Sequence, residues 1–85
     1  MSDRPSAVAG LEVTEVTAGL VVYQDSSDSV HYLNGTASVV FTLCDGRRNR
    51  EAIAHAVAVV FGADAVSPGS LAGCLTELHE AGLIE

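Results

Sequence analysis

Short runs in which hydrophobic and polar residues alternate make up the first part of the chain. Residues 11–17, 20–24 and 29–33 are rich in Val, Thr and Tyr, which are common in strands. Between these runs stand Ala18-Gly19 and the polar segment 25–28, both typical of hairpin turns. The pattern predicts three antiparallel strands.

From Asn34 onward the apolar residues recur at the spacing of an amphipathic helix. Three such segments each have a polar capping residue in front and a glycine behind. The residues that bound them are Asn34 with Gly46, Asn49 with Gly62, and Ser67 with Gly82. Pro68 suits the first helical position, because the N–H group that it lacks would have no partner within the helix. The second part of the chain is therefore predicted to form three helices.

Each predicted helix has one apolar stripe that must be covered. The expected buried residues are Ala37, Val40, Phe41 and Cys44 in the first helix, Ile53, Val57, Val60 and Phe61 in the second, and Leu71, Cys74, Leu75 and Leu78 in the third. Helices of about three turns with a single stripe are unstable alone, so they pack on one another and on the sheet. We predict an α+β domain of order β-β-β-α-α-α over residues 11–85, preceded by a flexible arm over residues 1–10.

Acidic residues dominate the charge of the chain. Four Lys and Arg stand against eleven Asp and Glu, which gives a formal net charge of −7. This charge repels nucleic-acid phosphates. No segment has the ~18 apolar residues of a membrane span, and no signal peptide is recognisable. We expect a folded cytoplasmic protein with neither nucleic acid nor membrane as a partner.

No catalytic or metal site can be assembled from the sequence. Cys44 and Cys74 lack the spacing of a metal-binding pair and stand among apolar residues, which indicates buried, reduced thiols. His31, His55 and His79 fall on three different predicted elements, so no two have ligand spacing. Neither a phosphate-binding glycine loop nor a Ser/His/Asp set is present. We therefore expect no enzymatic activity, no metal and no cofactor.

Arg47, Arg48 and Arg50 hold three of the four basic residues and form the one positive patch of the sequence. The patch fits a solvated turn between two helices, and it also fits a docking point for an acidic group on a peptide or partner enzyme. Asp45 and Gly46, just before it, are interpreted as parts of the same turn.

Three short motifs occur in order at the spacing found in a known family. They are Leu33-Asn34-Gly35-Thr36-Ala37, Leu43-Cys44-Asp45-Gly46 and, near the end, Leu78 with Ala81-Gly82-Leu83. Over about residues 11–85 the chain resembles the PqqD family. The resemblance implies a winged-helix-like shape and a non-catalytic role, in which the leader segment of a ribosomally made precursor peptide binds as an extra strand. The leader is held for a separate modifying enzyme, such as a radical enzyme, a cyclase or a protease.

Carried over residue by residue, the resemblance puts the leader between the third strand and the third helix. The implied peptide-binding residues are Ser29, Val30, His31, Tyr32 and Leu33 in the strand and Leu71, Leu75 and Leu78 in the helix. Alternation places Val30 and Tyr32 on one face of the strand and His31 and Leu33 on the other. Which leucines line the groove and which fill the core stays open, and Thr76 and His79 are candidates for its rim.

Two other functions compete with leader binding. An open sheet edge also fits a structural or oligomerisation domain that pairs with itself. Three helices beside a small sheet superficially fit a winged-helix DNA-binding regulator, but the net charge of −7 and the lack of a basic helix weigh against it.

Overall fold

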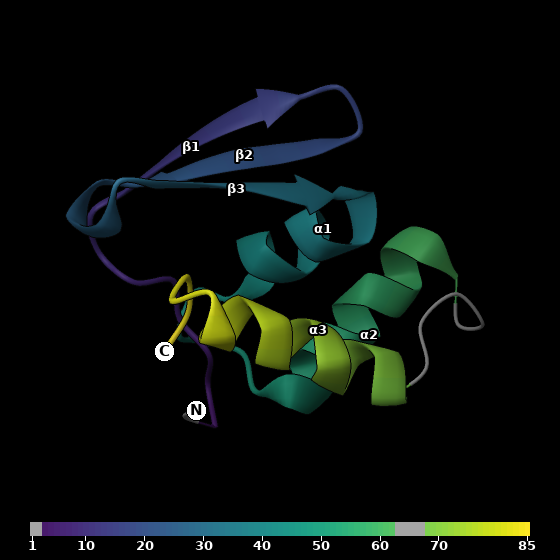
Figure 1. The fold of residues 1–85 in the computed structure, drawn as a ribbon. Helices are drawn as coiled ribbons and strands as arrows, with labels where there is room; N and C mark the ends of the chain where they lie inside the picture. Colours follow the sequence, from purple (N-terminus) through teal and green to yellow (C-terminus); the bar gives the residue numbers. More distant parts are fainter. Residues whose placement is uncertain (1–2, 63–67) are drawn as a thin grey trace.

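The computed structural model describes residues 3–62 and 68–85. Its elements are β1 (Leu11–Val16), β2 (Gly19–Gln24), a short 3₁₀ turn (Asp25–Ser27), β3 (Ser29–Asn34), α1 (Gly35–Leu43), α2 (Arg50–Phe61) and α3 (Pro68–Glu80). The strands form one antiparallel sheet in the order β1-β2-β3. The three helices all lie on the same face of this sheet (Figure 1). The predicted α+β fold and the order of its elements are confirmed.

The β1–β2 hairpin turns one residue earlier than the sequence suggested. Val16 pairs with Gly19, so Thr17 and Ala18 form the turn, and Ala18 is left-handed with a φ of 66°. Gly19 instead begins β2 and lies directly against β3. A Cβ atom at Gly19 would overlap the carbonyl oxygen of Leu33. This glycine is therefore needed for close strand packing and not for the turn.

Side-chain caps begin the first two helices at the predicted residues. The Oδ1 atoms of Asn34 and Asn49 each accept a hydrogen bond of 2.9 Å from the backbone N–H three residues further on. Gly62 follows α2 with a φ of 95°, and Gly82 follows α3 with a φ of 78°. Both glycines end their helices as predicted. The expected cap Ser67 lies outside the described residues.

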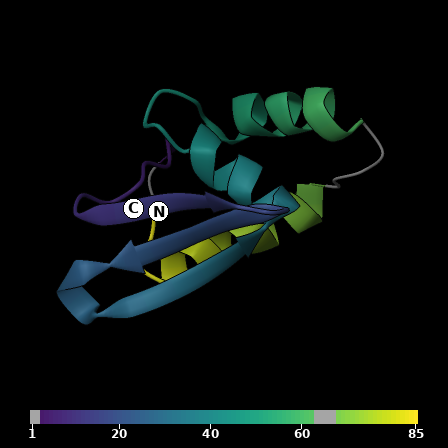
Figure 2. The same ribbon diagram turned by 90° about the horizontal axis from the view of Figure 1, so that it is seen from above.

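The core lies between the helices and the sheet. Its members are Leu20, Val22, Leu33, Val40, Phe41, Cys44, Ile53, Val57, Leu71, Leu75, Leu78, Leu83 and Ile84. The sequence prediction was wrong for Val60 and Phe61, which are 61% and 40% exposed. Figure 2 shows the last turn of α2 extending beyond α1, so the described part of the chain leaves both side chains open to solvent.

The segment that we expected to be a flexible arm includes residues that contact the domain. The N–H groups of Ala7 and Val8 each donate a hydrogen bond of 3.0 Å, to the carbonyl oxygens of Cys44 and Leu83 respectively. The side chain of Pro5 is fully buried. These contacts and those between Ser6 and Glu85 place residues 6–8 beside residues 83–85, as both ribbon views show (Figures 1 and 2). Composition did not reveal them, because they are made chiefly by backbone groups.

Candidate peptide-binding site

β3 is an edge strand of the sheet. It pairs with β2 on one side, and within the described residues no strand lies on its other side. In an antiparallel edge strand about half of the backbone N–H and C=O groups point away from the neighbouring strand. These groups offer a ready template for another extended chain.

The side chains of β3 alternate between two environments. Val30 and Tyr32 are 65% and 60% exposed, and alternation places them on the opposite face of β3 from the buried Leu33. His31 and Leu33 point to the helical face, where Leu33 is buried and His31 is half-buried. The alternation expected from the sequence is therefore present.

A groove of about 390 Å³ lies between the open edge of β3 and the second half of α3. Its lining comes from β3, from the start of α1, from the second half of α3 and from the segment after α3. The residues are Val30, His31, Tyr32, Leu33, Asn34, Ala37, Cys74, Glu77, Leu78, Ala81 and Leu83. The open strand and the groove thus lie side by side.

Of the three α3 leucines predicted for this site, Leu78 alone lines the groove, together with the predicted Leu33 of β3. Leu71 and Leu75 are buried and line a second hollow, of about 310 Å³, against Ala54 of α2. The first half of α3 thus faces α2, whereas its second half faces β3. Thr76 is not among the groove residues. The expected rim position of His79 is likewise not part of the lining.

Sequence reasoning assigned Cys74 to the core stripe of α3 and assigned neither Glu77 nor Ala81 to the groove. Cys74, Glu77 and Ala81 line the groove together with Leu78. Cys74, Leu78 and Ala81 follow helical i, i+4, i+7 spacing, so Ala81, directly after α3, continues the face that Cys74 and Leu78 form. This second stripe was visible in the sequence. Its direction was not, because it depends on how α3 crosses the sheet.

Two polar features mark the chemistry of the groove. The Nε2 atom of His31 is buried and has no hydrogen-bond partner among the described residues. Burial, and then the nearby carboxylate of Glu77, raise the pKa of the Cys74 thiol. Burial is also the largest cause that raises the pKa of Cys44, to about 11. Both thiols are therefore protonated near neutral pH and are poor nucleophiles.

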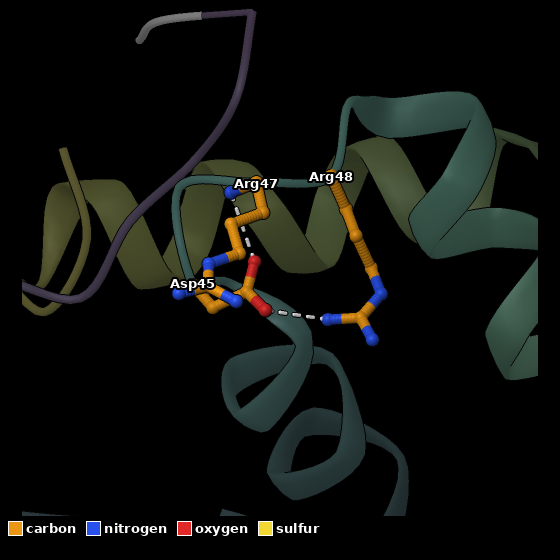
Figure 3. Close-up of polar contacts among 3 residues, drawn as sticks. All are labelled: Asp45, Arg47 and Arg48. Carbon is orange, nitrogen blue, oxygen red and sulfur yellow. Dashed lines mark hydrogen bonds and ion pairs between the residues drawn. The ribbon is translucent and has the colours of Figure 1, made fainter.

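The arginine patch lies away from this groove, at the turn between α1 and α2. The Arg48 side chain forms an ion pair of 2.6 Å with Asp45, whose other carboxylate oxygen accepts a hydrogen bond of 2.9 Å from the N–H of Arg47 (Figure 3). That N–H is the largest cause that lowers the pKa of Asp45, and the charge of Arg48 adds to it. Arg50 lines the hollow between α2 and α3. The ion pair between Arg48 and Asp45 thus stabilises the turn between α1 and α2.

Metal-ligating side chains do not gather anywhere in residues 3–62 and 68–85. In the same ranges, none of the helices has both the length and the apolar character needed to cross a bilayer.

Comparison with solved structures agrees with the fold described above. Two solved structures share the fold: "TbiB1 in Complex with the TbiA(beta) Leader Peptide", with a TM-score of 0.75, 14% identity and 94% of each chain covered, and "Lasso peptide synthetase B1 complexed with the leader peptide", with a TM-score of 0.76, 17% identity, and 96% of this chain and 98% of that chain covered. No curated protein sequence matches the chain. The family profile described as "Coenzyme PQQ synthesis protein D (PqqD)" matches residues 19–84. The chain belongs to the PqqD family.

Proposed function

We propose that this protein is a non-catalytic recognition domain that binds the leader segment of a ribosomally made precursor peptide. The leader adds to β3 as a further strand and is presented to a separate modifying enzyme, such as a radical enzyme, a cyclase or a protease. The observation that carries the proposal is the open edge of β3 lying beside a groove of about 390 Å³. Both structural neighbours are titled as complexes with leader peptides, which supports the same function here.

Strand addition uses both faces of β3. Side chains of an added strand alternate, so every second one would point toward α3, and the others would lie beside the exposed Val30 and Tyr32, which line the groove from the other face of β3. These two side chains are apolar or aromatic and more than half exposed, so a bound peptide would remove apolar surface from water on that face. Backbone pairing supplies affinity, and the two rows of side chains supply specificity.

The other open edge of the sheet is less suited to an incoming strand. β1 has two carboxylates, Glu12 and Glu15, among its six residues, and charged side chains on an edge strand oppose pairing. β3 has no acidic or basic residue apart from His31. The difference favours β3 as the docking edge. The competing hypothesis is a structural or oligomerisation domain that pairs with itself. The charge of −7 on each copy opposes such self-association.

A matched pair of substitutions tests the docking edge. Tyr32 and Thr14 both pair with Val21, so they occupy equivalent positions on the two edge strands. As a probe we suggest peptides selected on the immobilised protein from a phage-displayed random library. Tyr32→Gln should weaken binding by about 1–2 kcal/mol, or roughly five- to thirtyfold in Kd, whereas Thr14→Gln should leave it nearly unchanged.

Isothermal titration calorimetry measures both affinities, and thermal unfolding shows whether the two variants are equally folded. Equal losses in the two variants, or no loss at Tyr32, would contradict docking at β3. Sedimentation of the wild-type protein adds a further check, because a dimer that persists at saturating peptide would favour self-pairing through the edge.

A further inference from the structure

The groove beside β3 contains one acidic side chain. Among its lining residues only Glu77 has a carboxylate, and none has the positive charge of a lysine or an arginine. Glu77 is exposed. Among residues 3–62 and 68–85, Glu77 forms no ion pair with another described residue, and the Arg48–Asp45 pair stands at the turn between α1 and α2. Its negative charge is therefore not paired with a cation of the described residues.

The charge of Glu77 reaches the interior of the groove. The Cys74 thiol, one helical turn earlier, has a pKa that is raised by burial and then by this carboxylate. Cys74 and Leu78 flank Glu77 in the lining. A peptide seated in the groove would exclude water around the carboxylate, and a charge in such surroundings interacts more strongly than a fully solvated one.

His31 adds a second polar group without a partner inside the chain. It lines the groove from β3, opposite α3, and its buried Nε2 has no hydrogen-bond partner among the described residues. Buried polar atoms are seldom left without partners. The groove is thus apolar at Leu78 and Ala81 but has polar groups on both walls for which the described part of the chain provides no partner.

Resting on the proposed leader binding, we propose that the segment recognised by this groove is basic. It has a lysine or an arginine at the position that faces Glu77 and an apolar residue at the next position that enters the groove, over Leu78. The net charge of −7 acts in the same direction, because it attracts a basic segment at long range and repels an acidic one.

The experiment uses the phage-displayed random library as the probe and compares four proteins. Peptides selected on the wild-type protein should be enriched in Lys or Arg at one position. Glu77→Gln should abolish this preference, and Glu77→Lys should replace it with Asp or Glu at the same position. The matched control is Glu80→Lys, which changes the net charge equally from an exposed residue of α3 outside the groove lining, and it should keep the basic preference.

One selected peptide then quantifies the pairing. Replacing its basic residue by methionine should weaken binding to the wild-type protein and to Glu80→Lys by about three- to tenfold, the range of a partly desolvated ion pair, but should leave binding to Glu77→Gln unchanged. The loss of affinity for the wild-type protein that this replacement causes should be smaller at high salt.

The outcomes separate this inference from the function on which it rests. Peptides that shift the NMR amide signals of β3 but show no charge preference would overturn the inference and leave leader binding intact. A change from basic to acidic selected peptides that is as strong with Glu80→Lys as with Glu77→Lys would also overturn the inference, because net charge alone would then explain the preference. Selected peptides that leave the β3 amides unchanged would overturn both.

Discussion

Gly19 gives the sharpest test of how β3 is held in place. A Cβ atom there would overlap the Leu33 carbonyl oxygen and would lie 3.1 Å from the Leu33 carbonyl carbon and 3.3 Å from the Tyr32 hydroxyl. Because the obstruction is backbone, Gly19→Ala must move β2 and β3 apart at this end. Overpacking costs about 1–3 kcal/mol, and we expect the upper end of that range.

This loss is a large part of the total stability. A chain of 85 residues is stabilised by about 4–13 kcal/mol, and in a domain of this size each kcal/mol shifts the Tm by about 4–8 °C. Thermal unfolding followed by circular dichroism should therefore show Gly19→Ala lowering the Tm by about 12–24 °C. The shift should be accompanied by weaker peptide binding, because β3 is displaced.

Gly73→Ala is the matched control. Gly73 lies in the exposed interior of α3, and a Cβ atom there would meet no atom within 4 Å. The same substitution should here raise the stability by about 0.5–1 kcal/mol through helix propensity, and the Tm by about 2–8 °C. A Gly19→Ala protein as stable as the wild type, or a destabilised Gly73→Ala, would refute the packing that we describe.

Three further predictions concern single side chains. Iodoacetamide should modify Cys74 faster as the pH rises toward the raised pKa of its thiol. Mass spectrometry should show that a saturating peptide slows this reaction severalfold, while the buried Cys44 stays unmodified. An unchanged rate at Cys74 would place the peptide elsewhere. His31→Leu should raise the free energy of unfolding in urea by about 1 kcal/mol, because it removes a buried polar atom that has no partner in residues 3–62 and 68–85. A decrease would show that Nε2 has a partner, such as an ordered water. The pKa of Asp45 is lowered in the folded state, so its contribution to stability is present above the ordinary carboxyl pKa of 3.8 and is lost as the pH falls through the lower folded value. Urea unfolding at a series of pH values should therefore show less acid destabilisation for Asp45→Asn, and identical profiles would contradict this.

Features set by neighbouring residues could be predicted from the sequence. The caps at Asn34 and Asn49 depend on a side chain and a backbone N–H only three residues away, and the alternation along β3 follows from strand geometry alone. The family motifs likewise lie within short segments, and the PqqD resemblance is confirmed.

Features set by contacts between distant segments could not be predicted from the sequence. Gly19 was assigned to a turn because its contact with Leu33 requires knowledge of the β2–β3 register. The exposure of Val60 and Phe61 depends on how far α2 extends past its neighbours. Cys74 and Glu77 belong to the groove because α3 crosses from α2 toward β3. Helical periodicity identifies a face but not its neighbour.

The central claim, that a leader peptide adds to β3, is tested most directly by amide hydrogen exchange measured by NMR with and without a saturating selected peptide. Strand addition should slow exchange at alternate amides of β3, whose outward N–H groups gain partners, and should leave the amides of β1 (Leu11–Val16) unchanged. Protection confined to β1, or to the hollow between α2 and α3, with β3 unaffected, would contradict the claim.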